Sequence, residues 1–280
     1  MAKRSGAVSD NSGVLLTLFR YVIVAIVLVV SIYPLLWVFI SSFKKNPGGL
    51  GLPEEWVFDG YISIFTKLNV HTYFINSLII TIFSTIISVL VVAMAAYAVA
   101  RVDFKGKSLI IMMFSMTLFI PSTAISFPIY RLLNDMNLAD TRLGVILLYS
   151  GLGIAVTFFI LYSYFISIPK EIEEAAQIDG CGYFSTFFRV IVPMAKPGLA
   201  TAGILVFLNN WNEFYFASIL LKSADKMTIP ALLGQFKTAY ATNYNGMFSA
   251  IVVAVLPTII LFFLVSDSFI KSLTAGAVKG

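Results

Sequence analysis

Three carboxylates, two alanines and a closing glycine are gathered in the eight residues EEAAQIDG, from Glu173 to Gly180. Carboxylates at this density could pair with Arg or Lys side chains of another protein. The alanines would let a second backbone approach closely. The chemistry that this segment suggests is recognition of a protein partner, although an ordinary solvated helical loop fits the same composition equally well.

A second group of polar residues lies in the stretch LNNWNEF, which interrupts an otherwise apolar segment. Asn209, Asn212 and Glu213 stand at positions i, i+3 and i+4, so they share one face of a helix. Polar groups at membrane depth usually face a bundle interior or a water-filled cavity. Hydrogen bonding between helices explains the same residues equally well.

Several other kinds of chemistry are excluded by residue type. The chain has one cysteine, Cys181, and one histidine, His71, so it can form neither an internal disulfide nor a histidine-cluster metal site. The sequence GKS at residues 106–108 resembles the end of a phosphate-binding loop, but Arg101 stands where that loop needs its first glycine. We expect no catalytic residue, no metal and no cofactor in this chain, which is therefore not predicted to be an enzyme.

The elements that must position these residues are membrane helices. The chain of 280 residues is 59% hydrophobic and 12% charged, with a mean hydropathy of +0.92. A spanning helix needs about 20 mostly apolar residues. The sequence predicts an all-α polytopic membrane protein with six transmembrane helices in one domain, residues 1–280. The expected spans are residues 21–40, 76–100, 108–129, 144–166, 198–221 and 247–270.

Lys and Arg residues predict the orientation of these spans, because short cytoplasmic loops carry an excess of them. The short loop RVDFKGK between the second and third spans is strongly basic. We therefore expect both termini in the cytoplasm. Residues 167–197, which include EEAAQIDG, then form a cytoplasmic loop, and residues 271–280 form a cytoplasmic tail.

The loop of residues 167–197 has local signals for two short helices. Pro169 suits the first position of a helix, and Glu171, Glu173 and Glu174 suit its positive N-terminal end. Gly180 suits its end, because glycine readily adopts a positive φ. The second helix would present one apolar face, formed by Phe184, Phe187, Phe188 and Ile191, and would end at Pro193 and Pro197.

These residues also resemble a known pattern. Glu174-Ala175-Ala176, Asp179-Gly180 and residues 190–193 resemble the EAA loop of ATP-binding-cassette (ABC) importer permeases. The family pattern has E-A-A, then three residues and G, then nine residues and I-x-L-P. This chain departs mildly from it, with Val190 for Ile, Val192 for Leu and Cys181 for Ala.

Further stretches resemble one branch of that family. SSFK, YAVARVDFKGKSLI, WNEF and the ending LTAGAVKG are similar to the smaller permease subunit of maltose/maltodextrin-type importers. The resemblance implies the type I importer transmembrane fold in the cytoplasmic membrane of a prokaryote. It also implies a heterodimer with a second permease, two copies of an ATPase subunit that bind ATP and Mg, and an extracytoplasmic sugar-binding protein.

The resemblance assigns expected roles to individual residues. Coupling to the ATPase is expected of Glu173, Glu174, Ala175, Ala176, Asp179 and Gly180. Contact of the tail with the ATPase is expected of Thr274, Ala275, Gly276 and Lys279. The polar residues of LNNWNEF, and not the resemblance, suggest a translocation path along Asn209, Trp211, Asn212 and Glu213, where Trp211 could stack on a sugar ring. The resemblance places the bound sugar mostly on the other permease subunit.

Maltose or maltodextrin is the expected cargo, with another short glycan such as a galacto-oligosaccharide as the alternative. Two other functional classes are open. A proton-coupled secondary carrier would use Glu213 and Asp267 as titrating groups, but it would leave the loop of residues 167–197 unexplained. A membrane scaffold without transport activity is the third hypothesis.

Overall fold

The computed structural model describes residues 11–47, 49, 51–236 and 244–277, and the secondary structure in these ranges is helical throughout. The first half contains α1 (Asn11–Ser41), α2 (Asp59–Thr66), α3 (Val70–Arg101), α4 (Lys107–Thr117), the 3₁₀ turn η1 (Ser122–Ile125), α5 (Ser126–Asp135) and α6 (Arg142–Gly151). The second half contains α7 (Ile154–Ser167), α8 (Glu171–Ile178), α9 (Tyr183–Thr186), the π-helical turn η2 (Phe187–Ile191), α10 (Val192–Met194), α11 (Lys196–Trp211), α12 (Tyr215–Leu220), α13 (Ile229–Gln235) and α14 (Tyr244–Ala277).

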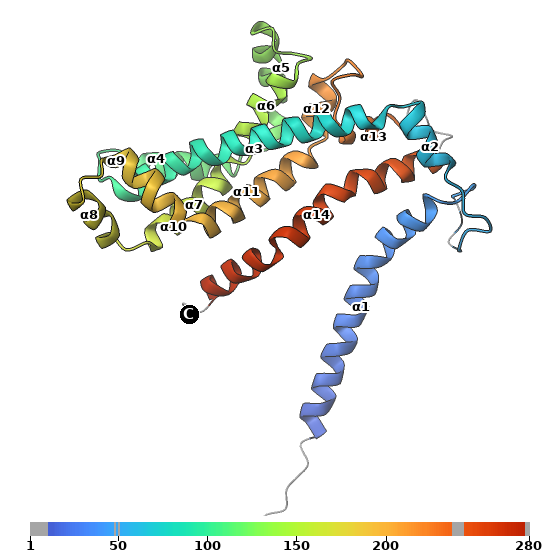
Figure 1. The fold of residues 1–280 in the computed structure, drawn as a ribbon, viewed down its shortest axis with the longest axis horizontal. Helices are drawn as coiled ribbons and strands as arrows, with labels where there is room; N and C mark the ends of the chain where they lie inside the picture. Colours follow the sequence, from blue (N-terminus) through green and yellow to red (C-terminus); the bar gives the residue numbers. More distant parts are fainter. Residues whose placement is uncertain (1–10, 48, 50, 237–243, 278–280) are drawn as a thin grey trace, which may run out of the picture.

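Helix α3 runs along the packed body from one end to the other (Figure 1). It packs against α6, α7 and α11, while α14 packs against α11 and α2. The short helices α8 and α9 lie at the C-terminal end of α3, and α2 and α13 lie toward its N-terminal end. We call these the α8 end and the α13 end of the body.

Helix α1 stands away from the body for most of its length (Figure 1). Its most apolar 18-residue window is 0% buried within the chain. Near its C-terminal end, the Trp37 ring meets Phe248 of α14 edge to face, with ring centroids 5.1 Å apart. An apolar helix that its own chain leaves exposed for most of its length suits a lipid environment.

Among the described residues, three single helices are long and apolar enough to cross a membrane, namely Leu16–Ser41, Val70–Arg101 and Tyr244–Leu264. Three further pairs of helices qualify when each bent pair is taken as one span, so the total reaches six. The pairs bend by 95° between α4 and the η1–α5 segment, by 50° between α6 and α7, and by 80° between the α9–α10 segment and α11. The fold class is therefore confirmed as an all-helical membrane domain.

Local sequence explains two of these interruptions. Pro121 adopts an extended conformation (φ −62°, ψ 125°) immediately before η1, which separates α4 from α5. Gly153 has a positive φ of 71° immediately before α7, a conformation that glycine adopts without strain. The segments expected as spans at residues 108–129 and 144–166 are thus bent helix pairs.

The segment expected as a span at residues 198–221 also differs from a single helix. Helix α11 ends at Trp211, and the chain turns before α12 begins at Tyr215. The side chain of Glu213 explains the turn, because its Oε1 and Oε2 accept hydrogen bonds from the backbone amides of Phe216 (2.8 Å) and Ala217 (3.0 Å). The backbone amides in the first turn of a helix have no acceptor within that helix. A side chain that accepts hydrogen bonds from them therefore favours the start of a new helix at this point.

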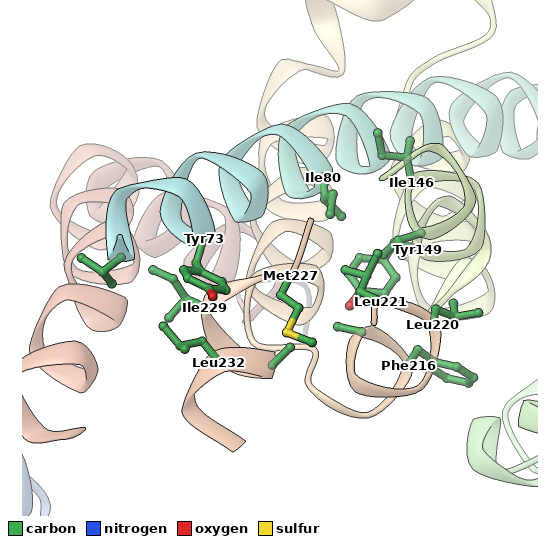
Figure 2. Packing of buried hydrophobic residues seen from close by; sticks show 14 of the residues in the cluster. Tyr73, Ile80, Ile146, Tyr149, Phe216, Leu220, Leu221, Met227, Ile229 and Leu232 are labelled. Carbon is green, nitrogen blue, oxygen red and sulfur yellow. The ribbon is translucent and has the colours of Figure 1, made fainter. Parts of the chain in front are cut away.

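Two buried clusters hold the body together. The first lies toward the α13 end, where Ile80 of α3, Tyr149 of α6 and Leu221 after α12 are each fully buried (Figure 2). The second lies toward the α8 end, where Phe158 and Phe165 of α7 pack with Phe187 of η2. Both clusters include side chains of α3, so this helix contributes to both cores.

Candidate functional site

Helix α8 is built as the local signals predicted. Glu171, Glu173 and Glu174 occupy its first turn, where carboxylates interact favourably with the helix dipole by about 0.3–1 kcal/mol each. Gly180 has a φ of 84°. Its amide donates to Gln177 O (3.0 Å), and the Cys181 amide donates to Ala176 O (2.9 Å). This pair of bonds is the Schellman arrangement, so the predicted helix end at Gly180 is confirmed.

One side of α8 faces the body of the chain. Glu173 and Ala176 are buried, with 8% and 7% of their surfaces exposed. Glu173 Oε1 lies 2.5 Å from Nε of Arg101, the last residue of α3, and Oε2 accepts a hydrogen bond from the Tyr97 hydroxyl at 3.1 Å. Arg101 Nη2 also donates to the carbonyl oxygen of Ile168 (2.8 Å), just after α7. The carboxylate of Glu173 therefore binds within the chain and is not available to a partner protein.

The opposite side of α8 is open. Glu174, Ala175, Asp179 and Gly180 are exposed, and Ile178 leaves 86% of its surface accessible. Two negative charges, a small residue and one large apolar side chain thus stand together on the outer surface of this helix. Of the six residues expected to couple to an ATPase, four lie on this surface, while Glu173 and Ala176 attach the helix to the body.

Aromatic rings next to α8 add contacts between α3 and the segment that follows α8. The Tyr97 ring lies 5.3 Å from Tyr183 and 4.9 Å from Phe187, measured between centroids. The predicted single apolar face on the second short helix was wrong, because Phe187 and Ile191 are buried whereas Phe184 and Phe188 are 68% and 49% exposed. The π-helical turn of η2 changes the angular spacing that a regular α-helix would give these four residues.

The LNNWNEF stretch divides into buried and exposed residues. Trp211 is 2% exposed, its Nε1 donates to Ala254 O (2.9 Å), and its ring stacks parallel to Phe207 at 6.0 Å. The expectation that Trp211 stacks on a sugar ring does not fit this placement, because both its ring and its polar atom are already engaged. Asn209 and Asn212 are exposed.

Glu213 is also engaged within the chain. Besides capping α12, its carboxylate accepts a short hydrogen bond from the hydroxyl of Tyr149 on α6. The Glu213 side chain therefore stabilises the turn between α11 and α12 and does not lie on an open surface. Of the four residues expected along a translocation path, Asn209 and Asn212 are the two that remain accessible.

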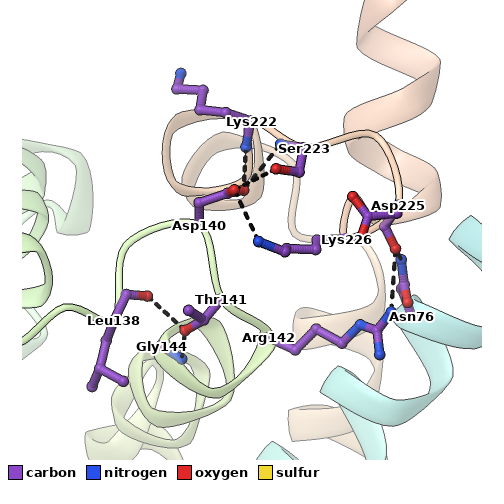
Figure 3. A network of polar contacts seen from close by, with 10 residues as sticks. All are labelled: Asn76, Leu138, Asp140, Thr141, Arg142, Gly144, Lys222, Ser223, Asp225 and Lys226. Atoms are coloured by element: carbon purple, nitrogen blue, oxygen red, sulfur yellow. Dashed lines mark hydrogen bonds and ion pairs between the residues drawn. The ribbon is translucent and has the colours of Figure 1, made fainter.

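A polar network at the α13 end was not anticipated from the sequence (Figure 3). The carboxylate of Asp140 accepts hydrogen bonds from the amides of Lys222 (2.8 Å) and Ser223 (3.0 Å), the Ser223 hydroxyl (2.5 Å) and Lys226 Nζ (3.1 Å). The Ser223 hydroxyl bond is the main cause that holds the pKa of Asp140 well below its usual range. Asp140 itself has a positive φ of 53°, a signal that no sequence pattern disclosed.

Helix α3 anchors the other side of the same loop. Asn76 Nδ2 donates to the carbonyls of Asp225 (2.8 Å) and Met227 (2.9 Å), and Ser77 Oγ accepts from the Ile229 amide (2.9 Å). Halfway along α3, Ser84 Oγ accepts a hydrogen bond from Asn210 Nδ2 of α11 (2.9 Å). These contacts, and those of Arg101 and Tyr97, had no signal in the sequence, because each joins segments far apart in the chain.

The remaining predicted residues lie near the C-terminus. Thr274, Ala275 and Gly276 fall on the backbone of the last turns of α14, while Lys279 lies outside the described residues. Among the described residues, no group of three or more His, Cys, Asp or Glu side chains is placed to hold a metal ion.

Comparison with known proteins places this geometry among membrane transport components. The chain is 36% identical over 264 residues to a probable ABC transporter permease protein, YurM, of Bacillus subtilis, with 93% of this chain and 88% of the relative covered. It is 35% identical over 257 residues to the diacetylchitobiose uptake system permease protein NgcG of Streptomyces coelicolor (90% and 85% covered). It is 34% identical over 264 residues to the arabinooligosaccharides transport system permease protein AraQ of Halalkalibacterium halodurans (91% and 94% covered).

The fold is similar to that of a chain in the crystal structure of a bacterial ABC transporter involved in the import of the acidic polysaccharide alginate. The TM-score is 0.81 at 23% identity, covering 94% of this chain and 100% of that one. The family model for binding-protein-dependent transport system inner membrane components matches residues 92–275, which include α8, α11 and most of α14. The chain therefore belongs to the family of binding-protein-dependent transport system inner membrane components.

Proposed function

We propose that this chain is the permease subunit of an ATP-driven importer for a short oligosaccharide. The observation that carries the proposal is the exposed surface of α8, held rigidly to the body by Glu173 and Ala176 in a chain of this transport family. Several relatives are named for oligosaccharide uptake, which supports a glycan as the cargo.

The proposed partners are a second permease subunit, two ATPase subunits that bind ATP and Mg, and an extracytoplasmic sugar-binding protein. The exposed carboxylates of Glu174 and Asp179 would pair with basic side chains in a groove of the ATPase. Ala175 would allow close approach of the two backbones. Closure of the ATPase dimer would then move α8, and the body would follow because α8 is attached to it.

The proposed orientation has both termini and α8 in the cytoplasm. The α13 end, with the loop held by Asp140, would then face the outside and receive the sugar-binding protein. Asn209 and Asn212 are the proposed lining of the path, since they are exposed polar groups on α11 and immediately after it. The last turns of α14 and the tail, with Thr274, Ala275, Gly276 and Lys279, are proposed to approach the ATPase.

Maltodextrin is the first proposed cargo, on the strength of the sequence resemblance, with galacto-oligosaccharides as the alternative. Two relatives are named for the transport of diacetylchitobiose and of arabinooligosaccharides, so a test of the cargo should include these two glycans. We therefore define a test panel of maltotriose, galactotriose, diacetylchitobiose and arabinotriose. Binding of one panel sugar by the partner binding protein, together with its ATP-dependent uptake, would identify the cargo.

The experiment that tests the coupling role compares two neighbouring alanines. Ala175→Trp places a large ring on the exposed side of α8 and should leave the fold intact, so we expect normal membrane abundance but at least a tenfold loss of uptake of the panel sugars. Ala176→Trp places the same ring on the buried side and should lower abundance itself. Normal uptake by the Ala175→Trp complex would contradict the proposal.

A proton-coupled carrier that uses Glu213 is the second candidate, and one observation argues against it. The carboxylate of Glu213 is occupied by two backbone amides and the Tyr149 hydroxyl. Proton transport would require this carboxylate to release its hydrogen-bond donors in every transport cycle, and the two amides that begin α12 would then lose their partner. Uptake that stops on ATP depletion but continues with an uncoupler would separate the two mechanisms.

A further inference from the structure

We infer that Arg101 is a positioning residue that transmits the movement of α8 to α3, and that α3 carries this movement to the opposite end of the molecule. The inference rests on the proposed coupling role of α8. It adds a specific joint, the Arg101–Glu173 ion pair, and a specific rod, helix α3.

The joint brings three elements together at one guanidinium group. Arg101 ends α3, and its Nε lies 2.5 Å from Glu173 Oε1 of α8, while its Nη2 binds the carbonyl of Ile168 at the end of α7. The side chains of Arg101 and Glu173 are 7% and 11% exposed. Arginine suits this position because its planar group can bind two partners in fixed directions at once.

The joint is buried, and this makes the pairing specific. Removal of one charge from a buried ion pair leaves the other without compensation, which is far more disruptive than loss of a surface pair. Tyr97, one turn before Arg101, adds a hydrogen bond to the second oxygen of Glu173. Both carboxylate oxygens of Glu173 are therefore bound by α3, so α8 cannot shift relative to α3 without breaking these contacts.

Helix α3 is linked to the α13 end of the body by contacts already described. Along α3, Ser84 binds Asn210 of α11, and Asn76 and Ser77 hold the loop of residues 225–229. Arg101 and Asn76 are separated by about 37 Å of helix at about 1.5 Å per residue. One helix thus contacts the coupling element at one end, the α11 segment near its middle and the far loop at the other end.

The test uses the complete complex, with the second permease and the ATPase subunits, reconstituted in liposomes with its binding protein. The quantity measured is the number of sugar molecules taken up per ATP hydrolysed, for the panel sugar that the unmodified complex transports fastest. We expect Arg101→Gln to keep assembly and ATP hydrolysis but to lower this ratio at least fivefold. Arg101→Lys should lower it less, because one charge contact remains.

The charge-swapped double variant Arg101→Glu with Glu173→Arg provides the test of specificity. We expect each single variant to uncouple and the double variant to recover at least half of the original ratio. A purely structural role would instead lower assembly in the two single variants. The control is Lys107→Gln, which breaks the exposed pair with Asp103 (3.2 Å, 25% and 89% exposed) six residues along the same loop and should leave the ratio unchanged.

Three results would overturn the inference: an unchanged ratio in Arg101→Gln, failure of both Arg101→Gln and Arg101→Lys to assemble, or no recovery in the double variant. The Ala175→Trp complex separates this failure from failure of the proposed function. If Ala175→Trp uncouples while Arg101→Gln does not, α8 couples without the joint. If neither uncouples, the coupling role of α8 is itself wrong.

Discussion

The hydroxyl of Ser223 donates a 2.5 Å hydrogen bond to the carboxylate of Asp140, which lies 83 residues earlier in the chain. Together with two backbone amides and Lys226, this contact fastens the loop after α12 to the turn before α6 (Figure 3). The arrangement stabilises the charged form of Asp140, which lowers the pKa of this group.

The first prediction concerns acid stability at this site. Because the pKa of Asp140 is lower in the folded chain than in the unfolded chain, its contribution is fully present above about pH 4 and is lost as the pH falls further. We expect Asp140→Asn to destabilise the loop by about 1.5–3 kcal/mol at pH 7, as typical of a hydrogen-bonded charge. Thermal unfolding midpoints at pH 7 and pH 3 should show the difference between variant and wild type shrinking in acid.

A matched control for this prediction is Asp135→Asn. Asp135 pairs with Arg131 on the surface of α5 at 3.9 Å, with side chains 66% and 74% exposed. Exposed pairs contribute little, so this variant should unfold like wild type at both pH values. Equal behaviour of the Asp135 and Asp140 variants would show that the network is not a stabilising one.

The second prediction concerns the end of α8. Gly180→Pro should reduce uptake by the assembled complex more than tenfold, because proline cannot adopt the φ of 84° and cannot donate the bond to Gln177. Gly182→Pro is the matched control, since Gly182 has a φ of −74° that proline accepts. Sugar uptake and complex yield should be measured for both, and equal uptake would remove Gly180 from the coupling assignment.

The third prediction separates a helix cap from a proton carrier at Glu213. Glu213→Gln keeps an oxygen that can accept a hydrogen bond from the α12 amides, so we expect it to retain most uptake. Glu213→Ala removes the cap and should cost about 0.5–2 kcal/mol in stability. Uptake into proteoliposomes that are supplied with ATP but have no proton gradient is the measurement, and a lack of uptake by both wild type and Glu213→Gln would favour the carrier mechanism instead.

The fourth prediction compares two glycines of α11. A Cβ atom on Gly198 would lie 2.6 Å from the Tyr164 ring of α7, whereas one on Gly203 meets nothing within 4 Å in the described chain. Gly198→Ala should therefore destabilise the protein by about 1–3 kcal/mol. Gly203→Ala should be neutral or stabilising by up to about 1 kcal/mol, because alanine favours helix. Thermal unfolding of the purified subunit complex would distinguish them.

The fifth prediction addresses the tail. Deletion of residues 274–280 should reduce uptake without lowering membrane abundance if the end of α14 contacts the ATPase. Quantitative immunoblotting of the membrane fraction provides the abundance, and uptake of the fastest panel sugar provides the activity. Unchanged uptake would mean that these residues are a frayed terminus with no part in coupling.

The parts of this structure that the sequence predicted well are those with local causes. Helix α8 begins with three glutamates and ends at Gly180 because the dipole and the positive φ act within a few residues. The apolar runs likewise predicted the main helices. Their interruptions were missed because the Pro121 and Gly153 signals lie inside stretches whose hydropathy alone fits an unbroken span.

Side-chain direction could not be predicted where tertiary contacts decide it. Glu173 and Glu174 are adjacent and identical in type. Glu173 nevertheless turns inward, because Arg101 and Tyr97 lie more than 70 residues earlier in the chain and bind its carboxylate, the first as an ion pair and the second as a hydrogen-bond donor. Trp211 turns inward for a similar reason, since its Nε1 donates a hydrogen bond to Ala254 O and its ring stacks on Phe207. A single sequence contains no direct signal for pairs of this separation.

The contacts of α3 also determine which changes to its length the molecule could tolerate. Each inserted residue would turn the helix beyond it by about 100° and lengthen it by about 1.5 Å. One residue added between Ser84 and Arg101 would point Arg101 away from Glu173 while Ser84 still faced Asn210. Substitutions on its lipid-facing side should be well tolerated, whereas a single insertion or deletion should not, so the register of this helix is a fixed dimension of the transporter.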